Sequence, residues 1–115
     1  MTLDGWLEPR LAEAPPELAD AIRQLVRELD EDDADIPGRL AAAALRGFDD
    51  VLTETAADLR SRRAALRLLA ADASLTYAFE AAADLDVDVV ALADRLGPRG
   101  VLGGMLDAAA AGEAS

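Results

Sequence analysis

Four polar residues recur at every fourth position within an otherwise apolar stretch of the chain: Asp72, Thr76, Glu80 and Asp84. At this spacing they would share one side of a helix. Carboxylates in a row can bind a divalent cation, or can supply an acid and a base to a reaction. The same row would also form if this were simply the one hydrated side of a buried helix, which is the interpretation we favour. We therefore assign no metal site, and Asp72 and Glu80 are the candidate ligands if the row binds a cation.

The densest group of basic residues in the chain consists of Arg60, Arg62, Arg63 and Arg67. Guanidinium groups bind phosphate or carboxylate through paired hydrogen bonds, and they stay charged at any working pH. They can equally pair with acids of the same protein. Asp58 precedes Arg62 by four residues, and the acidic run 30–35 offers further partners. We predict pairing within the protein or between subunits, with an external ligand as the alternative.

The acidic run itself, Asp30 to Asp35, holds five acids in six residues. Its spacing does not fit a helix-loop-helix calcium site, which needs glycine at the sixth position and glutamate at the twelfth. Those positions hold Asp35 and Ala41. The run is thus predicted to be a hydrated loop. An alternative function is that of an acidic decoy, in which this loop occupies a basic nucleic-acid-binding partner.

The composition excludes several classes of function. The chain has 115 residues, no histidine, no cysteine and a formal net charge of −12. Histidine-dependent catalysis and zinc sites built on His or Cys are impossible, and a net negative charge repels nucleic acid. We expect one domain over residues 1–115, no cofactor and no membrane partner. No signal peptide is recognisable, which predicts a cytoplasmic protein, and the lack of lysine and asparagine suggests a GC-rich genome or a high-salt cytoplasm.

Apolar residues recur at helical spacing throughout, so the predicted fold is all-α, a compact bundle of about five helices. Thr2 would cap a short first helix, in which Pro9 is tolerated only if a new turn begins there. In the second helix, Leu18, Ile22, Leu25 and Leu29 form one apolar stripe. Gly47 and Asp49 could divide the third helix into two. The expected helices start at Thr2 and Pro16, and then span about 37–59, 61–85, 89–96 and 100–110.

The fourth predicted helix is apolar on most of its circumference between residues 64 and 83, which indicates a central element covered on several sides. Four short neighbours would leave part of it uncovered, so we expect contact with another protein, most simply a second copy of the chain. The last predicted helix carries small residues four apart, which permit close helix contact. The residues expected to make such contacts are Leu66, Leu69, Tyr77, Phe79, Gly100, Gly104 and Met105.

Residues 49–51, 58–63 and 71–80 are similar in order to a stretch of the polyprenyl diphosphate synthases, where an Asp-rich motif and paired arginines precede a Gly-Asp-Ala-Leu-Leu helix. This resemblance covers less than a third of the chain. The second Asp-rich motif of those enzymes is missing here, and Ala71 stands where the family has glycine. We assign no family from it.

The sequence therefore predicts a small acidic, non-catalytic helical protein with an adaptor, accessory or regulatory role, which binds itself or another protein. The alternative from a different class is a small enzyme, or a binder of a cation or phosphate ligand. In that case, the acids Asp72 and Glu80 must converge with Arg62 and Arg63 on one pocket.

Overall fold

The computed structural model describes residues 2–29, 35–53 and 60–96, and in these ranges every regular element is an α-helix. The helices are α1 (Leu3–Leu11), α2 (Pro16–Arg27), α3 (Ile36–Leu52), α5 (Arg62–Asp84) and α6 (Val89–Leu96). This confirms the predicted all-α fold. The helix expected over 100–110 and the predicted continuation of α3 over 54–59 lie outside the described residues.

Local signals set where the helices begin. Thr2 and Ser61 each accept a hydrogen bond from the backbone N–H three residues ahead, at 3.0 Å, as predicted for N-caps. Pro16 occupies the first position of α2. Asp35, expected in the loop, instead caps α3 through a 2.7 Å bond from the Gly38 N–H, so α3 begins one residue before Pro37. Three side-chain oxygens thus fix the starts of α1, α3 and α5.

Two residues expected to interrupt helices do not do so. The first helix continues through Pro9 to Leu11, although a proline inside a helix removes one backbone hydrogen bond. The third helix continues past Gly47, where the missing Cβ lets α3 lie close to α5 and α2. A Cβ added at Gly47 would lie 2.8 Å from the Cβ of Ala71 and 3.2 Å from a methyl group of Leu25. Gly47 therefore permits close packing and does not divide the helix.

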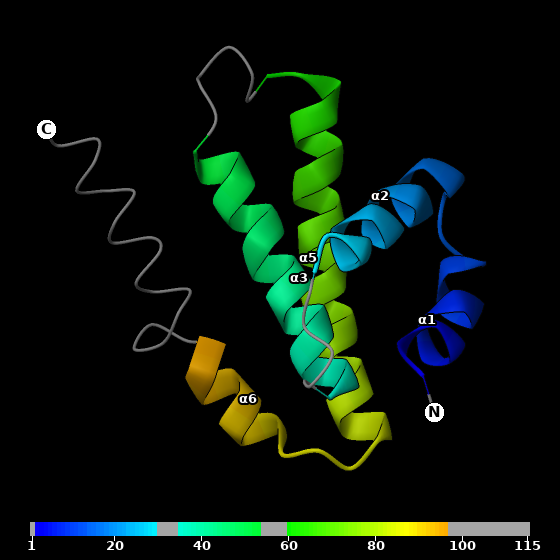
Figure 1. Ribbon diagram of the computed structural model, residues 1–115, viewed down its shortest axis with the longest axis vertical. Helices are drawn as coiled ribbons and strands as arrows, with labels where there is room; N and C mark the ends of the chain where they lie inside the picture. The colour runs from blue at the N-terminus through cyan, green and yellow to red at the C-terminus, as the bar shows by residue number, and fades with distance from the viewer. Residues whose placement is uncertain (1, 30–34, 54–59, 97–115) are drawn as a thin grey trace, which may run out of the picture.

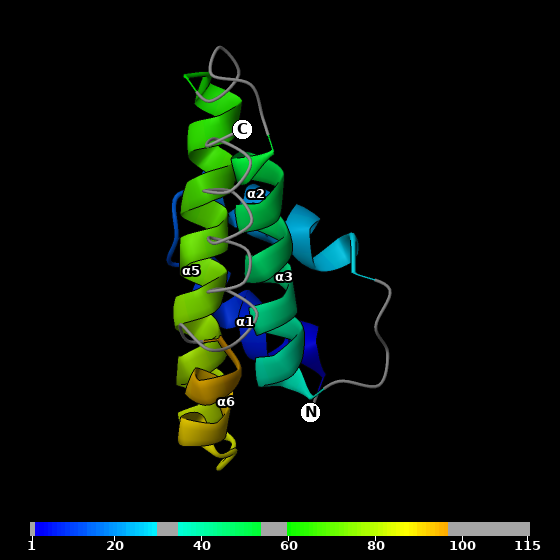
Figure 2. The same cartoon turned by 90° about the vertical axis from the view of Figure 1, so that its left-hand side faces the viewer.

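Helices α3 and α5 form an antiparallel hairpin at the centre of the molecule (Figure 1). One side of this hairpin packs against α2, with α1 beyond it. Figure 2 views the hairpin from its other side, where α6 lies across one end nearer the viewer than α1 and α2. The hairpin is therefore covered by α1 and α2 on one side, and in part by α6 on the other.

The packing of α5 differs from the predicted large apolar core helix in one respect. Its fully buried side consists of small residues: Ala64, Ala70, Ala71, Ser74, Ala78, Ala81 and Ala82. Ser74 satisfies its hydroxyl by donating to the Ala70 carbonyl at 2.8 Å. By contrast, Leu68 is 44% exposed and Leu69 is 57% exposed. Helix α5 is central, but it is its alanines that form the close contacts and its leucines that remain at the surface.

The chain leaves α5 through a turn with one strained residue. Asp86 has φ 56°, in the left-handed region that glycine adopts most easily. The N–H of Val87 donates to the carbonyl of Ala82 at 2.8 Å, which closes the helix end in the six-residue pattern typical of such caps. Asp88 then caps α6 by accepting from the Ala91 N–H at 3.1 Å. This turn sends the chain across to the side of the hairpin opposite α2.

Candidate interaction surface

Arg67 is the member of the predicted arginine group that is held most firmly. Its guanidinium lies 2.7 Å from a Glu28 carboxylate oxygen of α2 and also bonds Asp50 of α3, with Nε at 3.0 Å from that carboxylate. Its side chain is only 16% exposed. Burial lowers the pKa of Arg67, but the hydrogen bonds to Glu28 and Asp50 outweigh this effect, so its pKa is raised. Arg67 thus links α5 to Asp50 of α3 and to Glu28 at the end of α2, through its Nε and one of its two terminal nitrogens.

The other arginines of this group do not gather around Arg67. Arg62 pairs with Glu17 of α2 at the surface, where both side chains are largely exposed. Arg60 and Arg63 are exposed, and neither forms an ion pair within the described residues. Internal pairing is thus observed for two of the four. The expected partner Asp58 and most of the acidic run, residues 30–34, lie outside the described residues.

Two acids of the four-residue row have a structural partner that the sequence did not reveal. Arg10 of α1 lies 2.9 Å from a carboxylate oxygen of Glu80 and 2.6 Å from one of Asp84. The same guanidinium lies 3.6 Å from the centre of the Trp6 ring and donates to the Trp6 carbonyl at 2.8 Å. The two ion pairs hold α1 against the C-terminal end of α5. The i, i+4 spacing of Trp6 and Arg10 was the available signal, because a cation and a ring at that spacing share a helix face.

The structure does not bring together the residues that an enzyme or a cation site would need. Asp72 is exposed and lies about 12 Å along the α5 axis from Glu80, and Arg62 lies about 27 Å from Glu80 on the same axis. Within the described ranges, no three potential metal ligands cluster. The alternative function requires Asp72 and Glu80 to meet Arg62 and Arg63 in one pocket, and the described structure does not bring these four residues together.

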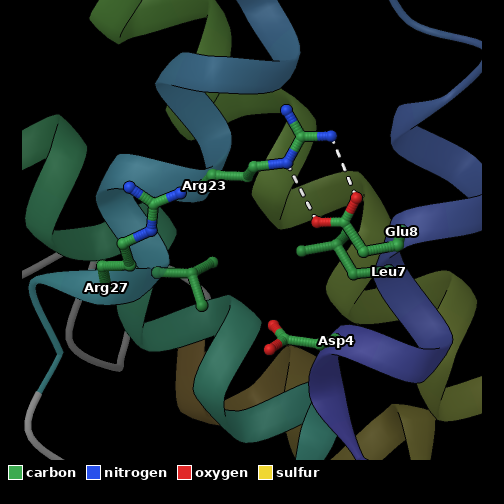
Figure 3. Close-up of a pocket in the computed structure, with 6 residues that line it drawn as sticks. Asp4, Leu7, Glu8, Arg23 and Arg27 are labelled. Atoms are coloured by element: carbon green, nitrogen blue, oxygen red, sulfur yellow. Dashed lines mark hydrogen bonds and ion pairs between the residues drawn. The ribbon is translucent and has the colours of Figure 1, made fainter.

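A small pocket between α1 and α2 is lined by charged residues (Figure 3). Its volume is about 180 Å³, and Asp4, Leu7, Glu8, Arg23, Val26 and Arg27 line it. Glu8 and Arg23 form a two-point ion pair with both distances at 2.9 Å. The hydrogen bond from Arg23 lowers the pKa of Glu8. The pocket is smaller than the 300 Å³ or more typical of ligand sites, and its main charged pair is already matched.

An apolar surface lies on the side of the α3–α5 hairpin that points away from α2. We call it the outer face and define it by three residues of each helix: Leu45, Phe48 and Leu52 of α3, and Leu68, Leu75 and Phe79 of α5. Within each set the residues are spaced three, four or seven apart, so they share one side of their helix. Four of the six are half-buried against the core, while Leu52 is 41% exposed and Leu68 is 44% exposed.

Two observations fix the direction of this face. Asp50 and Arg67 meet on the side of the hairpin that carries Glu28 of α2. At 100° per residue, the outer-face residues are turned from that side by about 80° to 160°. In addition, α6 lies across one end of this side, and its Leu92 is 1% exposed. Helix α6 spans only about 12 Å, whereas α5 spans about 35 Å. The rest of the outer face is therefore open within the described part of the chain.

The predicted contact residues fall in different places. Phe79 belongs to the outer face. Leu66 faces α2 beside Ala21, and Tyr77 packs edge-on against Trp6 with ring centres 6.2 Å apart. Leu69 is exposed, but its helical position is about 100° from that of Leu68. Gly100, Gly104 and Met105 lie outside the described residues. Sequence reasoning missed Leu68 and Leu52, since an all-apolar helix gives no sign of which leucine stays exposed.

A comparison of the chain with protein-family models, with curated proteins and with solved structures finds no match in any of the three. Among the described helices, none combines the length and the apolar character needed to cross a bilayer.

Proposed function

We propose that this protein acts by binding another protein through the outer face, in a non-catalytic accessory or adaptor role. The supporting observation is that Leu52 and Leu68 are each more than 40% exposed beside four half-buried apolar side chains, while the same hairpin packs alanines inside. Single exposed leucines are ordinary, but large apolar side chains grouped on one face are typical of interaction surfaces.

The expected strength of this contact follows from the exposed area. Full burial of a leucine contributes about 1.5–3 kcal/mol. Covering the exposed parts of Leu52 and Leu68 therefore contributes roughly 1 kcal/mol each. Association itself costs at least about 4 kcal/mol in lost freedom. The partner must then supply apolar side chains of its own, as α6 supplies the buried Leu92 at one end of the hairpin.

The predicted homo-oligomer would be one form of this function. Two hairpins pairing through their outer faces would form a four-helix bundle, a common way to bury two apolar helix faces. That association would depend on Leu68 as much as binding to a different protein would. The two forms differ in a simple measurable property, because only self-association makes the mass of the purified protein depend on its concentration.

A pair of adjacent leucines provides the test. Leu68→Asp places a charge on the outer face, whereas Leu69→Asp places the same charge on an exposed leucine of the same helix in another direction. Both variants and the wild type would be compared by quantitative affinity capture from the source cells and by sedimentation velocity at micromolar concentrations. We expect Leu68→Asp to lose the captured partner, or the self-association, and Leu69→Asp to retain it.

Circular dichroism should first show that both variants keep the helical content of the wild type. If both substitutions then leave binding and self-association unchanged, or both abolish them to the same extent, the outer face is not the interaction surface and the proposal fails.

A further inference from the structure

Among the described residues, the outer face is bordered by two acidic side chains without a basic partner. Asp49 of α3 directly follows Phe48, and Asp72 of α5 lies four residues after Leu68 and three before Leu75. Both are exposed, and neither carboxylate forms an ion pair or a side-chain hydrogen bond within the described ranges. At 100° per residue each falls just outside the apolar strip of its helix. The open face is thus an apolar strip with one carboxylate along each edge.

The arginines of the hairpin are directed elsewhere. Arg46 of α3 lies 3.5 Å from Glu28 and also donates to the Glu28 backbone carbonyl at 2.9 Å. Arg67 binds Glu28 and Asp50. Both guanidinium groups therefore lie on the α2 side of the hairpin. The ion pairs of the α3 and α5 arginines neutralise acids on that side, so within the described ranges the carboxylates at the edge of the outer face stay unpaired.

We infer that the outer face receives a basic amphipathic helix of a different protein, with apolar side chains between α3 and α5 and Lys or Arg residues against Asp49 and Asp72. This inference rests on the proposed function and names the chemistry of its partner. Complementary charge at the rim of an apolar interface selects the partner and speeds the encounter. An amphipathic helix laid in a groove is a recurrent mode of recognition.

Charge also distinguishes this partner from a second copy of the chain. Each copy has a net charge of −12, so two copies repel at long range. Pairing through the outer faces would bring four rim carboxylates towards one interface, where like charges disfavour association. A basic helix brings the opposite charge to the same place.

The test measures binding of three synthetic peptides to the full-length chain by fluorescence anisotropy. All three are 18-residue helix-forming sequences. The first has a Leu/Ile stripe flanked by Lys and Arg, the second has the same stripe flanked by Glu, and the third has the composition of the first with its apolar spacing scrambled. We expect only the first to bind, and its affinity to fall several-fold between 50 mM and 500 mM salt.

Variants of the chain then locate the contact. The double substitution Asp49→Lys with Asp72→Lys should weaken binding of the first peptide about tenfold, while Glu13→Lys, which changes an exposed acid of the α1–α2 turn, should change it less than twofold. Leu68→Asp should abolish binding, whereas Leu69→Asp should not.

The outcomes separate this inference from the proposed function. If the Glu-flanked peptide binds as tightly as the basic one and both depend on Leu68, the outer face is an interaction surface but the basic partner is excluded. If the wild type forms a dimer that Leu68→Asp dissociates and no peptide binds, a second copy is the occupant and the inference is overturned. If the basic peptide binds independently of Leu68, it binds away from the outer face and the inference is overturned, while the proposed function is judged by the capture and sedimentation results for Leu68→Asp and Leu69→Asp.

Discussion

The two sides of the α3–α5 hairpin are built from opposite kinds of residue. On the side packed against α2, most buried positions are alanines or Gly47, with Leu40 as the one buried leucine of the two helices, and Arg67 is bonded to Glu28 and Asp50. On the outer face the side chains are leucines and phenylalanines, which are partly exposed, and the carboxylates at its edges are unmatched within the described residues. Most of the larger apolar residues of the hairpin, with Leu40 as an exception, are on the less buried side.

This difference shows that burial in this protein is governed by how closely the helices approach. Interaxial distance depends on the side chains at the contact, and small residues permit the closest packing. Two helices that meet at Gly47 and Ala71 leave no room for leucine between them, so the leucines are displaced to the edges of the contact. The exposed leucines beside these closely packed alanines are consequently available to contact another helix.

The largest expected effect comes from widening the close contact. Gly47→Val should lower the free energy of unfolding by about 2–3 kcal/mol, because overpacking a tight interior typically costs 1–3 kcal/mol. The Cβ of Ala71 is attached rigidly to its backbone, so the helices themselves must move apart. Thermal or urea unfolding measures the change, and 1 kcal/mol corresponds to about 4–8 °C in Tm for a domain near this size.

Ala65→Gly is the control for this prediction, because residue 65 is exposed and the change alters helix propensity alone. It should lower the free energy of unfolding by about 1 kcal/mol. A Gly47→Val variant as stable as the wild type would mean that the α3–α5 contact is not as close as described.

The next effect tests the matched charges of the α2 side. Arg67→Met should lower the free energy of unfolding by about 1–2 kcal/mol, because it leaves the half-buried carboxylates of Glu28 and Asp50 without their shared partner. Arg62→Met is the matched control. Its ion pair with Glu17 is at the surface, where such pairs contribute at most about 1 kcal/mol. Equal losses for both variants, measured by urea unfolding, would contradict the distinction between them.

A substitution in the turn between α5 and α6 is expected to stabilise the protein. Asp86→Gly should raise the free energy of unfolding by about 1 kcal/mol, because a residue with a Cβ is strained in the left-handed region that Asp86 occupies. Asp86→Ala keeps that strain and should give no gain. The same thermal unfolding experiment compares the two, and a gain of similar size in both would assign the effect to the lost charge.

The smallest effect belongs to the outer face itself. Leu68→Gln and Leu69→Gln should each change the free energy of unfolding by less than about 0.5 kcal/mol, as is usual for surface substitutions. Urea unfolding of the full-length protein makes the comparison. A loss above 2 kcal/mol for Leu68→Gln alone would mean that other residues of the chain cover Leu68, and that the two sides of the hairpin are not different in the way proposed.

Much of the local structure follows directly from the sequence. The caps at Thr2 and Ser61 and the start of α2 at Pro16 were predictable, because each depends on atoms within about four residues. The stripe of α2 was also predictable, since Ile22 and Leu25 stand among polar residues and define one side. Both are fully buried, as that pattern requires.

The course of α3 at Gly47 and the ion-pair partners of Arg10 were not predictable. The possible division of α3 at Gly47 does not occur. From its residue type a glycine is only a weak helix former, and its contact with Ala71 on α5 cannot be seen in the sequence. The same limit applies to Arg10, which binds acids 70 and 74 residues away in the sequence. Of the candidate site, Phe79 was predicted on the contact surface, whereas Leu68 and Leu52 were not.

By itself, the sequence determined that the chain is helical, where its helices start, and that histidine and thiolate chemistry are absent. These properties depend on residue type and on hydrogen bonds between near neighbours. Only the tertiary structure decided which side of α5 is buried. Between residues 64 and 83 alanine and leucine occur on most sides of the helix, so hydrophobic periodicity gives no direction there. The close approach of α3 and α2 supplies that direction, by accepting alanines and leaving Leu68 on the outer face.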